Sequence, residues 1–172
     1  MNRVLVVAAL VAVLLAATVV LRSQEPVPVA VASERPEASC VWDDELQRTL
    51  DELGEDRADW VLVRADDGAA GKAYTTGMAA VDPEIGCEYV ASVVYHEWMH
   101  LQQLRMYGDD FGRTELGTSR MEIVADCGAW LLGSTYTPYR QELLDEHGIG
   151  CTSVDLADAR ELIAHVGVTA IG

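Results

Sequence analysis

Positive charge is scarce in this sequence. Only 12 of the 172 residues are Lys or Arg, with Lys72 as the single lysine, whereas 28 are Asp or Glu, so the formal net charge is −16. Binding to nucleic acid or to an anionic membrane surface requires a basic face, so the composition argues against both kinds of partner. Half of the residues are hydrophobic, which excludes a disordered chain, and the length suits one domain.

Long apolar segments are also few, and the clearest is at residues 4–21. Its 18 residues lie at the boundary between a signal peptide and a membrane-spanning helix. The length favours an uncleaved anchor, whereas the small residues of Ala30-Val31-Ala32 favour cleavage. We therefore expect residues 1–22 to be a signal peptide or an N-terminal membrane anchor. The rest of the chain would be secreted, or anchored in the cytoplasmic membrane with the domain outside.

Proline is rare and concentrated. Three of the five prolines lie in residues 23–39, which show no hydrophobic periodicity and are predicted to form an extended linker. The folded domain should then comprise residues 40–172. We expect it to be a monomer that meets the membrane only through the N-terminal segment.

Cysteine is limited to four residues, and their spacing matches no zinc-ribbon pattern. An even number of cysteines in an exported chain predicts disulfides, and four cysteines allow three pairings. We favour Cys40–Cys87 and Cys127–Cys151, because each pair would tie a terminal element to a central helix.

Hydrophobic periodicity and turn residues predict an α+β domain, with a small sheet first and helices after it. A polar loop is expected at residues 109–117. The predicted strands are 60–64 and 72–81, and the predicted helices are 42–53, 87–107, 119–132, 138–147 and about 153–166.

The predicted helix 87–107, the longest of these segments, contains in its middle the sequence His96-Glu97-Trp98-Met99-His100, an H-E-x-x-H motif. Residues four apart lie on one face of a helix, so His96 and His100 can direct two imidazoles at one cation. Glu97 is rotated by about 100° from His96, which suits the general base of a metal-bound water.

A catalytic zinc site needs a third protein ligand. Glu122 can supply it from the next predicted helix, and Asp126, four residues later, can accept the second N–H of a ligand histidine. An alternative remains open for Glu122, because Ser119-x-x-Glu122 also fits a helix capping box. Asp126 alone would most often be a solvated surface residue.

At this point the sequence resembles the gluzincin branch of zinc metallopeptidases. The bacterial neutral zinc metallopeptidase family and its relatives are similar in carrying H-E-x-x-H-x-x-Q, here His96 to Gln103, and E-x-x-A-D-C-x-A, here Glu122 to Ala129. Met99 stands where those families usually have Gly. Position 106 is Met, which excludes the third histidine of a metzincin-type site.

The resemblance implies a zincin-like fold, in which a small N-terminal β-sheet packs on the active-site helix and a helical C-terminal part follows. It implies that His96, His100 and Glu122 bind one Zn²⁺ per chain and that Glu97 is the general base. The His/His/Glu ligand set favours zinc, and manganese and cobalt remain alternative occupants. Asp126 would orient a ligand histidine, His96 more readily than His100.

The resemblance also implies a strand at a sheet edge that pairs with the substrate, and a side chain that stabilises the oxyanion. For the strand we expect residues 74–81, with Tyr74, Gly77, Met78 and Ala79 in contact with substrate, although an ordinary packed strand is the alternative. For the oxyanion the chain offers Tyr136, Tyr139, Arg140, His147 and His165, and spacing selects none of them.

The sequence therefore predicts an exported or membrane-tethered zinc peptidase that acts on a peptide or protein substrate. Two alternatives remain. One is a zinc-site scaffold that binds a peptide or protein partner without turnover. The other is an acidic, disulfide-linked domain without metal, in which both motifs are accidental.

Overall fold

The computed structural model describes residues 40–64, 68–108 and 117–168, with the backbone alone for 117 and 118. The predicted signal peptide or anchor and the predicted linker lie outside the described residues, as does most of the loop predicted at 109–117. Among the residues that are described, no helix combines the length and apolar character needed to cross a membrane.

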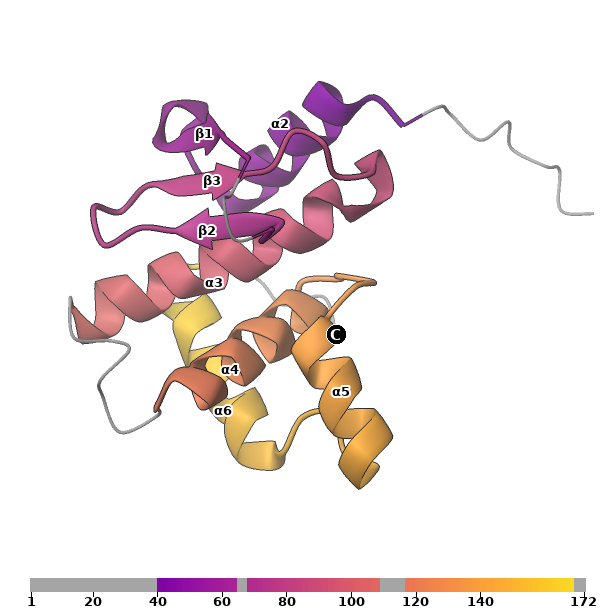
Figure 1. Ribbon diagram of the computed structural model, residues 1–172. Helices are drawn as coiled ribbons and strands as arrows, with labels where there is room; N and C mark the ends of the chain where they lie inside the picture. The colour runs from indigo at the N-terminus through magenta and orange to yellow at the C-terminus, as the bar shows by residue number, and fades with distance from the viewer. Residues whose placement is uncertain (1–39, 65–67, 109–116, 169–172) are drawn as a thin grey trace, which may run out of the picture. The chain divides into compact units, whose positions relative to one another are not determined.

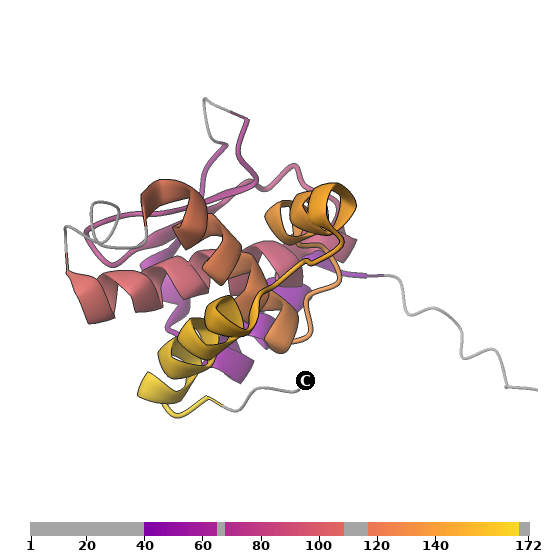
Figure 2. The ribbon, with the colours of Figure 1, turned by 90° about the horizontal axis from the view of Figure 1, so that it is seen from below.

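Helix α3 (Val90–Tyr107) lies at the centre of the fold, between the sheet and the C-terminal helices (Figure 1). Helices α2 (Trp42–Leu53), α4 (Gly117–Leu131) and α6 (Ser153–His165) also pack against it. Twelve of the 18 residues of α3 are buried, so the helix lacks a continuous polar face. The polar side chains of α3 are therefore packed between the sheet and the neighbouring helices. Seen from below, α4 crosses in front of α3 (Figure 2).

The sheet has three short strands, β1 (Trp60–Leu62), β2 (Gly71–Ala73) and β3 (Ala79–Val81), in the order β1-β3-β2. Strand β3 pairs in parallel with β1 and antiparallel with β2. All three residues of β3 are buried, whereas β2 is an edge strand of this sheet.

The prediction of one strand over residues 72–81 is wrong, because a tight turn divides this segment. Gly77 adopts φ +84°, a left-handed conformation that glycine tolerates without steric cost. The Tyr74 N–H donates to the Met78 carbonyl at 2.8 Å, and the Gly77 N–H donates to the Tyr74 carbonyl at 2.9 Å. The segment therefore forms a hairpin of β2 and β3.

The predicted helices are present, with small changes at their ends. Helices α2, α6 and α5 (Pro138–His147) lie where the periodicity and the capping residues predict them. Residues Cys87–Tyr89 form a 3-10 turn, η2, so α3 begins after it rather than at residue 87. Helix α4 begins at Gly117, two residues before the predicted start. A further 3-10 turn, η1, covers Arg57–Asp59. The coarse α+β class is therefore confirmed.

Both favoured disulfides are present. Cys40, before α2, is bonded to Cys87 in η2, and Cys127, on α4, is bonded to Cys151 before α6. All four cysteines are paired. Two disulfides are typical of an oxidising, extracellular-type environment.

Helices α3 and α4 approach closely at Met99 and Gly128. Met99 is fully buried, and a Cβ added at Gly128 would lie only 2.3 Å from Met99 Cε. The Met99 side chain therefore occupies the space that a side chain at position 128 would fill. The bulk of Met99 is thus accommodated by a glycine on the facing helix.

Candidate metal centre

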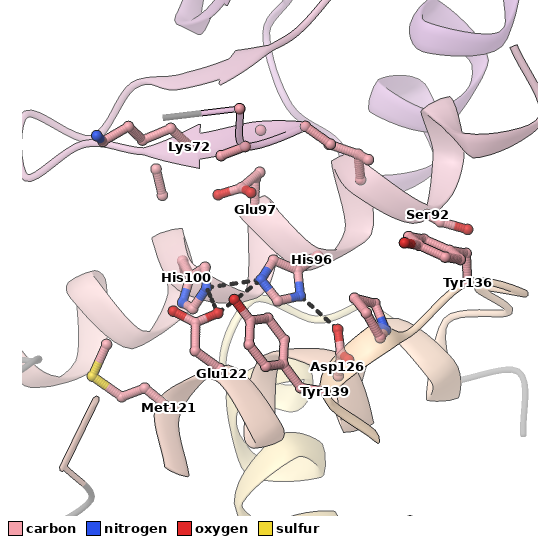
Figure 3. A pocket seen from close by; sticks show the side chains of 17 residues that line it. Lys72, Ser92, His96, Glu97, His100, Met121, Glu122, Asp126, Tyr136 and Tyr139 are labelled. Atoms are coloured by element: carbon pink, nitrogen blue, oxygen red, sulfur yellow. Dashed lines mark hydrogen bonds and ion pairs between the residues drawn. The ribbon is translucent and has the colours of Figure 1, made fainter. Parts of the chain in front are cut away.

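The two histidines of the motif lie one turn apart on α3, and their Nε2 atoms are 3.0 Å apart. Glu122, from the middle of α4, places Oε2 at 3.1 Å from each of these nitrogens (Figure 3). The three predicted ligand residues therefore meet at one point. They form a group whose composition and spacing are suited to a metal ion.

The hydrogen bonds of His100 determine which of its nitrogens carries a proton. Gln103 donates from Nε2 to the Met121 carbonyl at 3.0 Å, so its Oε1 is the atom that faces His100 Nδ1 at 2.8 Å. Because an amide oxygen only accepts, His100 must donate from Nδ1. A neutral His100 then presents a lone pair at Nε2, toward Glu122.

His96 is held in the same way by Asp126. Its Nδ1 lies 2.7 Å from Asp126 Oδ1, and the other carboxylate oxygen accepts the backbone N–H of Arg140 at 3.0 Å. Asp126 is fully buried and contacts His96, the histidine expected to be oriented by it. A neutral His96 therefore also presents a lone pair at Nε2.

With both histidines neutral, three acceptor atoms converge, and a cation among them offsets the repulsion of their lone pairs. In the polypeptide alone the cation is a proton on a histidine. Burial opposes a charge on His96, but hydrogen bonds to Asp126 and Glu122 outweigh burial and raise the pKa of His96 to about 10. Burial likewise opposes ionisation of Glu122, but the interactions with His100 and His96 outweigh burial and lower the pKa of Glu122 to about 2.

The ligand atoms also fit zinc by distance. Zn–N and Zn–O bonds of about 2.0–2.2 Å place tetrahedral ligands about 3.3 Å from one another. The three separations here are 3.0, 3.1 and 3.1 Å. Two imidazoles and one carboxylate are also a ligand set of catalytic zinc sites.

The capping-box interpretation of Glu122 is wrong. Helix α4 begins at Gly117, so Ser119 lies inside its first turn and is not the residue before the helix. The Glu122 carboxylate contacts the two histidines. The Ser119-x-x-Glu122 spacing therefore does not mark the start of this helix.

Gln103 had no predicted role beyond its place in the family pattern. It is fully buried, and it links the His100 ring to the carbonyl of Met121, the residue before Glu122. The signal was in the sequence, because a residue three positions after a ligand histidine lies on the same helix face.

Glu97 lies beside the ligand group, beneath β2 (Figure 3). Only 6% of its surface is exposed. Burial raises the pKa of Glu97, against the opposing charges of His96 and His100 and a hydrogen bond from the Ala73 backbone N–H. A buried carboxylate with a raised pKa is suited to accept and return a proton.

A cleft of about 500 Å³ opens over the ligand group. One wall is β2 with the residues before it, the floor is α3, and the opposite wall is α4 with the start of α5. The cleft is lined by Gly68, Ala69, Ala70, Gly71, Lys72, Ala73, Ser92, Val93, His96, Glu97, His100, Met121, Glu122, Asp126, Tyr136, Pro138 and Tyr139.

The expected substrate strand is misplaced. Tyr74 and Gly77 belong to the hairpin turn, Met78 follows the turn, and Ala79 is in the central strand. None of the four lines the cleft. The edge that faces the cleft is β2, which comes earlier in the chain.

Two of the oxyanion candidates reach the cleft. The Tyr139 ring is stacked on the His96 ring, with centroids 5.9 Å apart and an interplanar angle of 21°. Its hydroxyl points toward the place where Glu122 meets the histidines (Figure 3). Tyr136 also lines the cleft, but its ring packs edge-on against Tyr89 at 5.0 Å.

The other oxyanion candidates lie elsewhere. His147 is at the C-terminal end of α5, exposed, and 3.6 Å from Glu146. The Arg140 guanidinium lies over the Trp130 ring at 4.5 Å, and His165 is exposed at the end of α6. None of these three side chains lines the cleft.

Comparisons with protein-family models, with curated proteins and with solved structures found no match for this chain. The resemblance to metallopeptidases therefore rests on the two motifs, and the site has to be interpreted from its own residues.

Proposed function

We propose that this chain is a zinc-dependent peptidase with a zincin-like fold, exported or tethered to the membrane by its N-terminal segment. One observation carries the proposal. The Nε2 atoms of His96 and His100 and the Oε2 atom of Glu122 lie within 3.1 Å of one another, beside the buried carboxylate of Glu97, which is not part of this group. A site of this kind supports hydrolysis, because a metal held by these atoms would bring its bound water beside a general base.

The ligand residues would hold the metal, which when bound supplies Lewis acidity and lowers the pKa of a coordinated water. Glu97 then accepts a proton from the attacking water and returns it to the leaving amine. Asp126 and Gln103 hold the ligand imidazoles in the tautomer that leaves Nε2 free. The Tyr139 hydroxyl donates a hydrogen bond to the oxyanion.

The free edge of β2 is suited to align an extended peptide. Ala70 pairs with Asp82 and Tyr74 pairs with Met78 through backbone hydrogen bonds. In an antiparallel pair, residues that bond to the partner strand, such as Ala70 and Tyr74, alternate with residues whose backbone N–H and C=O point away from that strand. Gly71 and Ala73 are such residues, so they face the open side of the sheet, where a substrate strand can add.

The test is metal content together with peptide cleavage. Zinc per chain is measured by mass spectrometry on the full chain and on Glu122→Ala. The matched control is Glu161→Ala, which removes an exposed glutamate on α6. We expect one zinc per chain in the wild type and the control, and little zinc in Glu122→Ala. Equal zinc in all three would remove Glu122 from the ligand set.

Cleavage is then measured on a peptide library with the wild type and Glu97→Gln. We expect cleavage products from the wild type alone, at equal zinc content. Cleavage that survives in Glu97→Gln would contradict the assigned base. Zinc binding without cleavage in either protein would favour the non-catalytic scaffold.

A further inference from the structure

Gly71 lies on β2 at the point where the strand passes over α3. Its φ is not in the positive region, so its backbone conformation does not require glycine. The space left by the neighbouring side chains does require glycine at this position. A Cβ added at Gly71 would lie 2.7 Å from Cγ and Oε1 of Glu97 and 2.7 Å from Cγ1 of Val93. Contacts of that length are sterically forbidden, so any larger residue must displace the strand or the Glu97 side chain.

The same strand binds the carboxylate directly. The Ala73 N–H donates a hydrogen bond to Glu97. This N–H points to the free edge of the sheet, so the bond costs no pairing with β3. A buried carboxylate needs hydrogen-bond partners, and β2 supplies one because the absence of a Cβ at Gly71 lets the strand lie close to Glu97.

We propose that β2 fixes the position of Glu97, with Gly71 as a positioning residue that allows the strand to lie against the carboxylate and Ala73 as the donor that holds it. This inference rests on the proposed function, because it concerns the general base of that reaction. It also has a consequence for the substrate. Since the Ala73 N–H is engaged by Glu97, a peptide added to the edge has to be aligned by the backbone groups of Gly71 and by the Ala73 carbonyl.

The test uses Gly71→Ala in the full chain. We expect kcat to fall by about 10²-fold with little change in KM, because a displacement of about 1 Å at a reacting group has an effect of that size. Zinc content should be unchanged, since a Cβ at position 71 meets none of His96, His100 and Glu122 within 4 Å among its nearest neighbours. Hydrogen exchange at the Ala73 amide should accelerate toward the rate seen in Glu97→Ala.

Val93 provides the matched control, because it is crowded by the same added methyl group. Val93→Ala alone should keep the slow exchange of the Ala73 amide. In Gly71→Ala/Val93→Ala the Glu97 contact persists, so the loss of kcat should persist. Recovery of wild-type kcat in this double variant would mean that the glycine serves only the packing of Val93, and would overturn the proposal.

A second variant tests the same proposal in case the Gly71→Ala chain does not fold. Ala73→Pro removes the N–H, and proline is tolerated at a position that does not donate to the neighbouring strand. It should reduce kcat in the same way, and a folded Ala73→Pro chain with wild-type kcat would overturn the proposal.

If the wild type cleaves no peptide, the proposed function fails. The inference about Gly71 is then tested only by the hydrogen-exchange rate of the Ala73 amide. Equal rates in wild type and Gly71→Ala would then reject it.

Discussion

Gln103 connects His100 to the backbone just before Glu122, because its amide accepts from the His100 ring and donates to the Met121 carbonyl. One side chain thus fixes the tautomer of a predicted ligand on α3 and contacts the backbone beside a predicted ligand on α4. The distance between His100 and Glu122 therefore depends on a residue outside the predicted ligand set.

Replacement of Gln103 by Met keeps the volume and removes both hydrogen bonds. We expect the zinc affinity to fall by about 10–100-fold, the usual effect of losing a partner of a ligand histidine. Affinity is measured by competition with a chromophoric chelator.

The neighbouring Gln102 is the matched control for this change. It is equally buried, but its side-chain nitrogen and oxygen have no hydrogen-bond partner in the described part of the chain. Gln102→Met should leave the zinc affinity at the wild-type value. An equal loss in both variants would show that packing, rather than the bond to His100, is responsible.

Zinc binding should release protons. With a pKa of about 10, His96 carries a proton near neutral pH in the polypeptide alone, whereas the pKa of about 2 keeps Glu122 ionised. Zinc must displace that proton, so the apparent affinity should rise by up to about tenfold per pH unit between about pH 6 and 8. Titration calorimetry in buffers of different ionisation enthalpy counts the protons released.

The variant Asp126→Asn tests whether the proton released on zinc binding comes from His96. The hydrogen bond to the Asp126 carboxylate is the largest of the interactions that raise the pKa of His96, so a neutral amide acceptor in its place should lower this pKa and reduce the number of protons released. A binding enthalpy that does not depend on the buffer in the wild type would contradict the prediction.

Tyr139→Phe tests the oxyanion donor. We expect kcat to fall by about 10²–10³-fold, as for the loss of one such donor elsewhere, with zinc content unchanged. Tyr136→Phe is the control, because Tyr136 lines the same cleft but packs against Tyr89. A larger loss in Tyr136→Phe than in Tyr139→Phe would reverse the assignment.

Gly128→Val should destabilise the chain, because Met99 already fills the space beside Gly128. Overpacking of a core typically costs about 1–3 kcal/mol of unfolding free energy. In Gly128→Val/Met99→Ala the added methyl groups find room, so the two changes should be non-additive by about 1 kcal/mol. Urea unfolding with chelator present measures all four chains, and strict additivity would argue against the contact.

The helices and most of the site could be predicted from the sequence, because the relevant signals are local. The four-residue spacings of His96 and His100 and of Glu122 and Asp126 each fix one helix face. The hairpin could not be predicted in the same way. Residues 72–81 contain a single glycine, and its positive φ follows from the pairing of Tyr74 with Met78.

The steric role of Gly71 was also hidden, since it depends on how closely a strand approaches a helix. His147 shows the opposite case. Its chemistry suited the site, but the direction of α5 takes it away from the cleft.

The positions of the ligands along the chain have a consequence for the denatured state. His96 and Glu122 are 26 residues apart, and the Cys127–Cys151 disulfide that follows spans 24 residues. A metal held by the three ligands would close a loop from His96 to Glu122. This loop is nearly the same size as the loop closed by the Cys127–Cys151 disulfide, and it directly precedes that loop in the sequence. Cross-links that close loops of this size lower the entropy of an unfolded chain by an amount worth about 3.5 kcal/mol. Metal binding would therefore act as a third, reversible cross-link beside two covalent ones.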